Sequence, residues 1–362
     1  METKTRNIGI DFLRIISMML IVIAHIFKAG GLLYSPIHNG SYYVLWTIET
    51  IAYCSSVTCY ALLTGYLLVD KPFKLRRIIS LWMQVLFYSV SVLLLFLLFA
   101  PEVVTANDIY SALFPMVKSN YWYYTAYFCL FFFIPFLNVI IKHLDRRGMN
   151  MLCIYIIISC SVIPSLVGYD IICENNGYSV LWLAAMYILG AYLKKYGIPK
   201  WFCTWNAALI FILSVTISCV LLHYRGVDTL SLTDPFILLS SIVLVMRALQ
   251  LKWKEGIMSK FIIFLGSASF TVYIIHTHPL IWNNILINWF SSFIWLPTAW
   301  YIVAAIGISI VFIVVCSLIE ELRKMLFHLV KLDRLAKWLD WLFTFRFATR
   351  KNTKNIGGSS IK

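Results

Sequence analysis

Long apolar segments recur ten times along this chain, and each is about as long as a helix must be to cross a membrane. A spanning helix needs about 20 mostly apolar residues, because it rises about 1.5 Å per residue. The predicted spans are 8–27, 42–68, 77–100, 121–141, 151–168, 180–196, 204–222, 234–251, 260–284 and 298–318. The 362 residues are 61% hydrophobic and 13% charged, which excludes an ordinary soluble domain. The sequence therefore predicts an all-α fold, a polytopic membrane bundle of about ten transmembrane helices.

Basic residues alternate from one predicted loop to the next. Of the 30 Lys and Arg residues, all but four fall at the termini or in every second loop, and the intervening loops hold only Lys28, Lys118 and Arg225. The last of the four, Arg14, lies in the first span. By the positive-inside rule, this alternation places both termini in the cytoplasm. The formal charge of +14 is therefore assigned to topology and to anionic membrane lipid, and nucleic acid is not an expected partner.

The chain divides into three predicted parts: a membrane domain over 1–318, a basic amphipathic helix over 319–350 and a disordered tail over 351–362. In the second part, leucines recur at helical spacing with Lys and Arg between them, as in a helix that lies in the inner membrane surface. A partner-binding helix is the alternative.

The first predicted span carries three ionisable residues on one face. Asp11, Arg14 and His25 occur in IDFLRIISMMLIVIAH, and at roughly 100° per residue all three project within about 60° of one another. The eleven residues from Arg14 to His25 cover about 16 Å of helix axis, so the two lie at different membrane depths. The structural alternative is an Asp11–Arg14 pair with His25 hydrogen-bonded to a neighbouring helix. Three such residues on one face favour a functional site.

Two further ionisable residues are predicted at the depth of His25. Glu49 lies inside the second span and His276 lies in the outer third of the ninth, in FTVYIIHTHPLIW. Together they can supply a general base with an orienting partner. The alternatives are a protonated, structural Glu49 and a histidine, His276 or His278, that faces the membrane interface. Spacing does not support a zinc site from His25, Glu49 and His276, and no metal is expected.

A basic cluster follows the second span on the cytoplasmic side. It contains Lys71, Lys74, Arg76 and Arg77, and Arg14 enters the bundle from the same side. Inner loops are basic for topological reasons alone, which is the alternative explanation. Arginine also binds phosphate oxygens with two donors at once, so the cluster indicates a polyanionic ligand that approaches from the cytoplasm.

The pattern resembles the acyltransferase-3 family of integral membrane enzymes, which O-acylate cell-surface carbohydrates. The resemblance rests on an Arg and a His separated by ten residues and on four later segments. The residues concerned are Arg14 and His25 after Asp11, Thr64 to Leu68, the basic run to Arg77, Tyr121 to Tyr123 with the later Pro135, and Phe270 to Pro279. Ser80 is a departure, because the family often has a further Arg at this position, three residues after the Arg pair.

The resemblance implies acyl-CoA, with acetyl-CoA as the expected donor, as a substrate that binds from the cytoplasm. Its phosphates would contact Arg14, Arg76 and Arg77, next to Lys74 of the same cluster. The pantetheine arm would then carry the thioester up the bundle to His25.

The same resemblance assigns the reaction to the outer half of the membrane. His25 would act as general base on an acceptor hydroxyl, or as a transient acyl carrier, with Glu49 or His276 orienting it. The implied acceptor is a surface polysaccharide or a lipid-linked oligosaccharide, and the implied location is the cytoplasmic (plasma) membrane of a bacterium.

A transporter or flippase for a polar lipid or sugar is the alternative function, with the same Arg and His residues lining a substrate path. Such proteins often contain inverted repeats and paired broken helices, and the sequence shows neither. The basic cluster that is suited to phosphate lies on the cytoplasmic side alone, which also favours an enzyme over a transporter.

Overall fold

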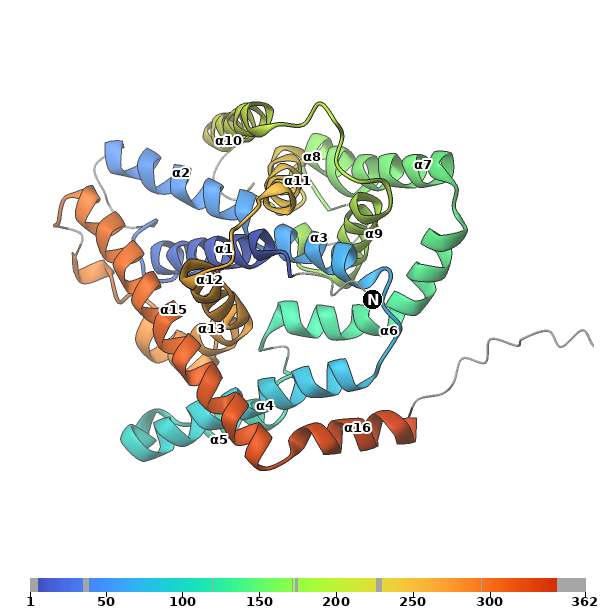
Figure 1. Cartoon of the computed structure of the whole chain (residues 1–362). Coiled ribbons are helices and arrows are strands. Elements are labelled where there is room, and N and C mark those ends of the chain that lie inside the picture. Colours follow the sequence, from blue (N-terminus) through green and yellow to red (C-terminus); the bar gives the residue numbers. More distant parts are fainter. Residues whose placement is uncertain are drawn as a thin grey trace, which may run out of the picture.

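The computed structural model describes residues 6–34, 39–118, 120–170, 172, 175–225, 230–293 and 295–343, and its regular elements there are helices (Figure 1). The predicted polytopic helical bundle is confirmed. Each predicted span corresponds to one helix or to consecutive helices. They are α1 (Ile8–Lys28), α2 (Asn39–Ser55) with α3 (Val57–Leu68), α4 (Arg76–Phe99), α6 (Trp122–His143), α7 (Arg146–Ile157) with α8 (Ile163–Val167), α9 (Val180–Tyr196), α10 (Thr204–Arg225), α11 (Pro235–Gln250), α12 (Ile257–Ser267) with α13 (Ser269–His276), and α15 (Thr298–Leu329).

Among the described residues, eight of these helices or pairs are long and apolar enough to cross a membrane. The other two, α9 and α11, have 17 and 16 residues. About half of the residues of each are buried by neighbouring helices, as Met186 and Val245 are. A helix enclosed by protein need not match the full thickness of the bilayer, because its ends meet protein groups instead of lipid.

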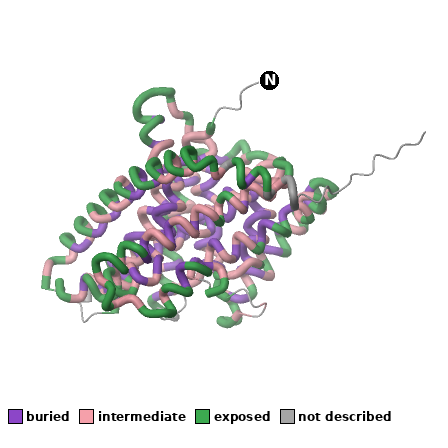
Figure 2. Tube along the Cα trace, turned by 90° about the horizontal axis from the view of Figure 1, so that it is seen from below, coloured by how far each residue is buried: buried purple, intermediate pink, exposed green. Residues whose placement is uncertain are grey.

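Exposed apolar side chains cover the outer helices. Leu98 and Phe99 on α4, Leu209 on α10 and Val311 on α15 are each more than half exposed. Figure 2 shows buried residues in the middle of the molecule and exposed ones along its outer helices. This distribution is typical of a protein whose surface is in contact with lipid.

Helix α1 lies in the middle of the bundle (Figure 1), where it packs against α2, α3, α11, α12, α13 and α15. Its first turn is capped by the Asn7 side chain, which accepts a hydrogen bond from the Gly9 amide. The central position explains why the ionisable residues of α1 face protein and not lipid.

Helices α3 and α9 touch backbone to backbone at two glycines. A Cβ atom on Gly65 would overlap the carbonyl group of Tyr187, and one on Gly190 would overlap that of Leu62. Only residues without a side chain permit this approach, which is a common way of packing helices in membranes. The contact fixes α3 firmly against α9.

Helix α15 continues past the predicted boundary at residue 318 to Leu329, so the first part of the predicted tail helix is continuous with the helix of the last span. The chain turns at Lys331, whose φ is 57°, and continues as the short amphipathic helix α16 (Leu332–Phe343). Asp340 of α16 accepts a hydrogen bond from the Arg76 amide at 3.1 Å, which joins α16 to α4. The predicted disordered tail, 351–362, lies outside the described residues.

The remaining helices are short and connect the spans. Helix α5 (Ala106–Leu113) follows α4, and its first turn is closed by Thr105 and Asp108, each of which bonds to the other's backbone amide. Helix α14 (Pro279–Ile281) and the π-helical turn Trp282–Leu286 follow α13.

Candidate active site

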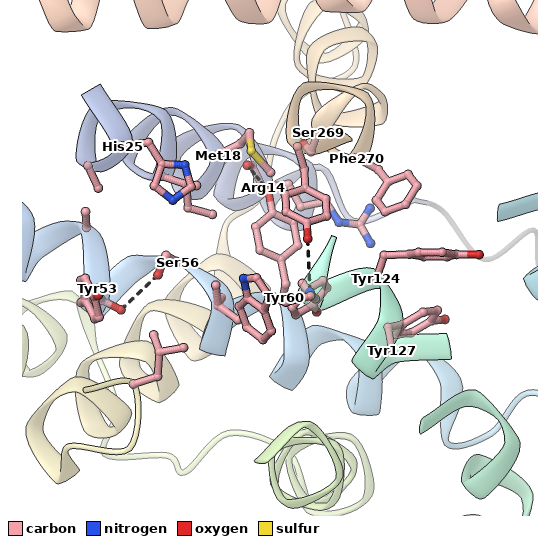
Figure 3. A pocket seen from close by; sticks show the side chains of 18 of the residues that line it. Arg14, Met18, His25, Tyr53, Ser56, Tyr60, Tyr124, Tyr127, Ser269 and Phe270 are labelled. Carbon is pink, nitrogen blue, oxygen red and sulfur yellow. Dashed lines mark hydrogen bonds between the residues drawn. The ribbon is translucent and has the colours of Figure 1, made fainter. Parts of the chain in front are cut away.

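A cavity of about 750 Å³ runs beside α1, and both Arg14 and His25 line it. Most of its other walls come from α2, α3, α6, α12 and α13. Figure 3 shows Arg14 and His25 on α1, with Tyr60 and Tyr127 on facing helices. Lys28, at the last turn of α1, also belongs to the lining. The cavity therefore connects the two depths that the first span was predicted to link.

The predicted Asp11–Arg14 contact is present but is not the principal one. Asp11 is buried, and its carboxylate accepts hydrogen bonds of 2.6 and 2.8 Å from Arg6. Arg14 reaches the same carboxylate at 3.4 Å. The hydrogen bond from Arg6 to Asp11 raises the pKa of the Arg6 guanidinium above its ordinary value. Arg6, which the sequence did not single out, thus holds Asp11 and leaves most Arg14 donors available to the cavity.

The other predicted phosphate contacts, Lys74, Arg76 and Arg77, are half-buried at the start of α4. None is among the residues that line the cavity. Arg77 donates to the Pro72 carbonyl at 3.0 Å, and it lies close enough to Tyr127, a cavity residue, to interact with it electrostatically. The structure therefore places this cluster beside the cavity and not inside it.

A lysine from the last span reaches the cavity wall. Lys324 donates to the Ser267 hydroxyl at 3.2 Å, and Ser267 lines the cavity. The adjacent Gly266 packs directly against Asp11, so Lys324 approaches the Arg14 end. The sequence missed it because the last span was predicted to end at residue 318.

His25 and His276, 251 positions apart in sequence, are brought together by α1 and α13. His25 Nδ1 lies 2.9 Å from His276 Nε2, and His276 Nδ1 lies 2.6 Å from the Val272 carbonyl oxygen. A carbonyl oxygen only accepts, so His276 Nδ1 carries the hydrogen and its Nε2 accepts one from His25 Nδ1. In neutral His25 the remaining nitrogen, Nε2, then holds a lone pair. His25 lines the cavity, whereas His276 lies behind it.

Glu49 belongs to the same cavity but not to the histidine pair. It is 2% exposed, and among the described residues its Oε2 atom is buried without a hydrogen-bond partner. Of the two residues expected to orient His25, His276 is the one bonded to His25 Nδ1. His278 faces elsewhere: it accepts from the Leu280 amide and contacts the Ser89 carbonyl. Within the described part of the chain, no group of three or more His, Cys, Asp or Glu residues is placed to hold a metal ion.

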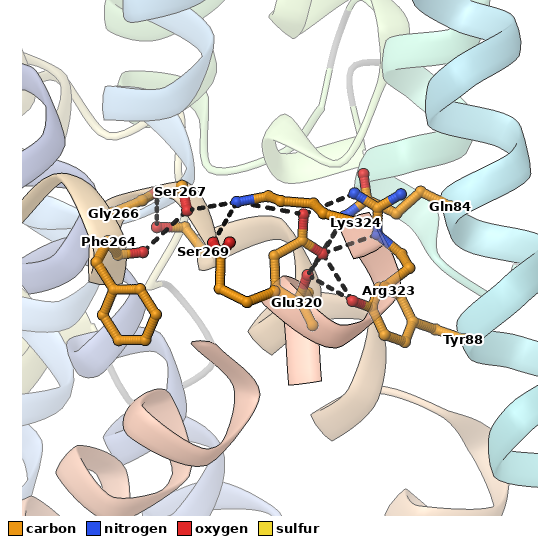
Figure 4. Close-up of polar contacts among 11 residues, drawn as sticks. Gln84, Tyr88, Phe264, Gly266, Ser267, Ser269, Glu320, Arg323 and Lys324 are labelled. Atoms are coloured by element: carbon orange, nitrogen blue, oxygen red, sulfur yellow. Dashed lines mark hydrogen bonds and ion pairs between the residues drawn. The ribbon is translucent and has the colours of Figure 1, made fainter. Parts of the chain in front are cut away.

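A third buried carboxylate, Glu320 on α15, was not predicted. It accepts hydrogen bonds from Tyr88 at 2.6 Å, Thr271 at 2.8 Å and Gln84 at 3.2 Å, and from Arg323 at 2.7 and 2.9 Å (Figure 4). This Glu320 cluster joins α4, α13 and α15. The sequence signal for this cluster was the spacing of Glu320 and Arg323, which lie three residues apart just beyond the predicted end of the last span.

The fold and the cavity define a class: a polytopic helical membrane protein with a histidine pair beside an internal cavity. A family model described as "Acyltransferase domain" matches residues 7–318, nearly the whole chain. The chain belongs to this family, which confirms the predicted resemblance, and it is a membrane acyltransferase. No curated protein and no solved structure matches it.

Proposed function

We propose that this membrane acyltransferase takes an acyl group, specifically acetyl, from cytoplasmic acyl-CoA. The acceptor is a hydroxyl of a bacterial surface polysaccharide or a lipid-linked oligosaccharide, and the enzyme lies in the plasma membrane. The observation that carries the proposal is that Arg14 and His25 line one cavity. An anion-binding group and a proton acceptor are thereby joined across about 16 Å of helix axis.

The donor end of the cavity is suited to the phosphates of coenzyme A. Arg14 keeps donors available because Arg6 holds Asp11. Lys74, Arg76 and Arg77 lie outside the lining, so we assign them to the more exposed nucleotide part of the donor. Arginine binds phosphate oxygens through paired, charge-assisted hydrogen bonds.

The middle of the cavity is suited to the pantetheine arm. Tyr60, Tyr123 and Tyr127 line it, together with Met18 and Leu63. Such a lining offers apolar surface with a few hydroxyl groups, which matches a long, mostly uncharged chain that contains two amides.

At the outer end, His25 Nε2 is the proposed general base. It accepts the proton of the acceptor hydroxyl as that oxygen attacks the thioester carbonyl carbon. The carbon–sulfur bond then breaks, and the coenzyme A thiolate leaves and takes the proton from His25. His276 orients the base and stabilises its charged form through the hydrogen bond between the two rings.

The first experiment measures acetyl-CoA binding to the purified protein in detergent. Wild type should bind saturably, and Arg14→Ala and Arg77→Ala should each weaken binding. Arg147→Ala is the matched control, because Arg147 is exposed on α7, away from the cavity. If folded wild type binds neither acetyl-CoA nor longer acyl-CoAs, the proposed mechanism is wrong and transport should be tested.

The second experiment separates binding from chemistry. His25→Gln should bind acetyl-CoA like wild type and lose acyl transfer by about 10²–10⁴-fold, the usual contribution of a positioned general base. Acyl transfer that persists at the wild-type rate in a stably inserted His25→Gln protein would refute this role for His25.

A further inference from the structure

The outer part of the cavity contains groups that the proposed reaction leaves unused. We propose that Glu49, Trp122 and Tyr178 form the binding site for the acceptor, and that this acceptor is a neutral hexopyranose ring. The ring lies against the aromatic side chains and donates one hydroxyl hydrogen bond to Glu49. This inference rests on the proposed function, because it names the acceptor of the same reaction.

The carboxyl group of Glu49 points to a missing donor. Glu49 is 2% exposed, it lines the cavity, and its Oε2 atom is buried without a partner among the described residues. Buried polar atoms in native proteins are nearly always hydrogen-bonded, so this carboxyl group is placed to accept a hydrogen bond from a ligand in the cavity. His25 does not supply this donor, because its Nδ1 bonds to His276.

Aromatic side chains line the same cavity, and Tyr53 and Tyr178 lie close enough to Glu49 to interact with it electrostatically. The Trp122 and Tyr178 rings lie 4.6 Å apart between centroids, and the hydroxyls of Tyr178 and Tyr53 are 3.3 Å apart. Trp282 also lines the cavity, with its ring edge-on to His25 at 5.0 Å. Pyranose rings present an apolar face of C–H groups and a rim of hydroxyls. Flat aromatic rings with polar tips complement both, and the site lies next to the proposed base.

The charge balance favours a neutral sugar. A lone buried carboxylate would attract a cationic substrate. Lys28, however, lies at the same end of the cavity and close enough to Glu49 to interact with it electrostatically. The two charges offset each other when Glu49 is ionised, and in either protonation state Glu49 can accept a hydrogen bond from a hydroxyl group.

The test uses simple glycosides as acceptors. Protein is purified in a detergent without a sugar head group, and coenzyme A release from acetyl-CoA is measured against the concentrations of methyl glucoside, methyl galactoside and methyl mannoside. With wild type, at least one glycoside should accelerate release saturably. Glu49→Gln should raise the half-saturating concentration of that glycoside at least tenfold and leave the dissociation constant of acetyl-CoA unchanged. Glu102→Gln, an exposed carboxylate after α4, is the matched control and should behave as wild type.

Three results would overturn the inference. If Glu49→Gln lowers the maximal rate without changing half-saturation, Glu49 acts on the reaction and not on acceptor binding. If acetyl-CoA binds but no glycoside accelerates release, the acceptor is not a neutral hexopyranose, and the donor side still stands. If acetyl-CoA itself does not bind, the proposed function fails together with this inference.

Discussion

Replacing Glu320 with alanine tests the Glu320 cluster most directly. The substitution removes the acceptor of five hydrogen bonds and leaves Arg323, whose side chain is 11% exposed, as a buried charge without its counterion. Removing one member of a buried ion pair costs about 3–5 kcal/mol. One kcal/mol shifts the unfolding temperature by roughly 2–4 °C in chains of 150–250 residues and by less in longer ones. We therefore expect the unfolding temperature of Glu320→Ala to lie about 5–10 °C below that of wild type.

The assay is thermal unfolding in detergent with a thiol-reactive dye. Cys59 and Cys316 are buried in the folded protein, so dye reacts with them as the bundle opens. The double variant Glu320→Ala/Arg323→Ala should lose less stability than the sum of the two single losses, because neither charge remains unpaired. A Glu320→Ala loss below about 0.5 kcal/mol, the size typical of surface substitutions, would refute this account of the cluster.

Three further predictions follow from the packing and from the site. Gly65→Ala should lower the unfolding temperature, because its Cβ would overlap a backbone carbonyl of α9, whereas Gly307→Ala, with open space around it, should be neutral or stabilising by up to about 1 kcal/mol. Arg6→Ala should weaken acetyl-CoA binding, because Asp11 would then attract Arg14 away from the phosphates of acetyl-CoA. Isothermal titration calorimetry measures the change in affinity. His276→Phe should lower the transfer rate by about 10–100-fold without changing acetyl-CoA affinity, as kinetics with both readouts can show.

Each of these predictions has a result that contradicts it. Equal unfolding temperatures for the two glycine variants would mean that α3 and α9 can separate without cost. Unchanged acetyl-CoA affinity in Arg6→Ala would show that Asp11 does not compete for Arg14. A normal transfer rate in His276→Phe would show that His25 needs no orienting partner.

Most of the helical architecture could be predicted from the sequence, because a bilayer imposes both length and apolar composition on every span. The end of the last span is the main difference. The sequence pattern placed Glu320 and Arg323 at the polar start of an interfacial helix. In the structure they pair with each other, and Glu320 also accepts hydrogen bonds from Tyr88 on α4 and Thr271 on α13. Sequence reveals a charged residue but not the distant groups that compensate for it.

The candidate site could be predicted only in part for a similar reason. Helical periodicity places Arg14 and His25 on one face, and both line the cavity. Depth estimates put His276 level with His25, but they could not distinguish His276, which bonds to it, from Glu49, which does not. The role of Arg6 was missed because Arg6 precedes the first span, where the positive-inside rule alone accounts for a basic residue.

The backbone contact between α3 and α9 has a consequence for how such an enzyme can diversify. The contact of α3 with α9 depends on Gly65 and Gly190, not on Thr64, whose side chain lines the cavity and whose hydroxyl bonds within its own helix. Mutations that reshape the cavity from this helix therefore need not disturb the scaffold. Selection for a new acceptor can thus act on the lining residues while the architecture persists, and directed evolution of acceptor preference should begin at those positions.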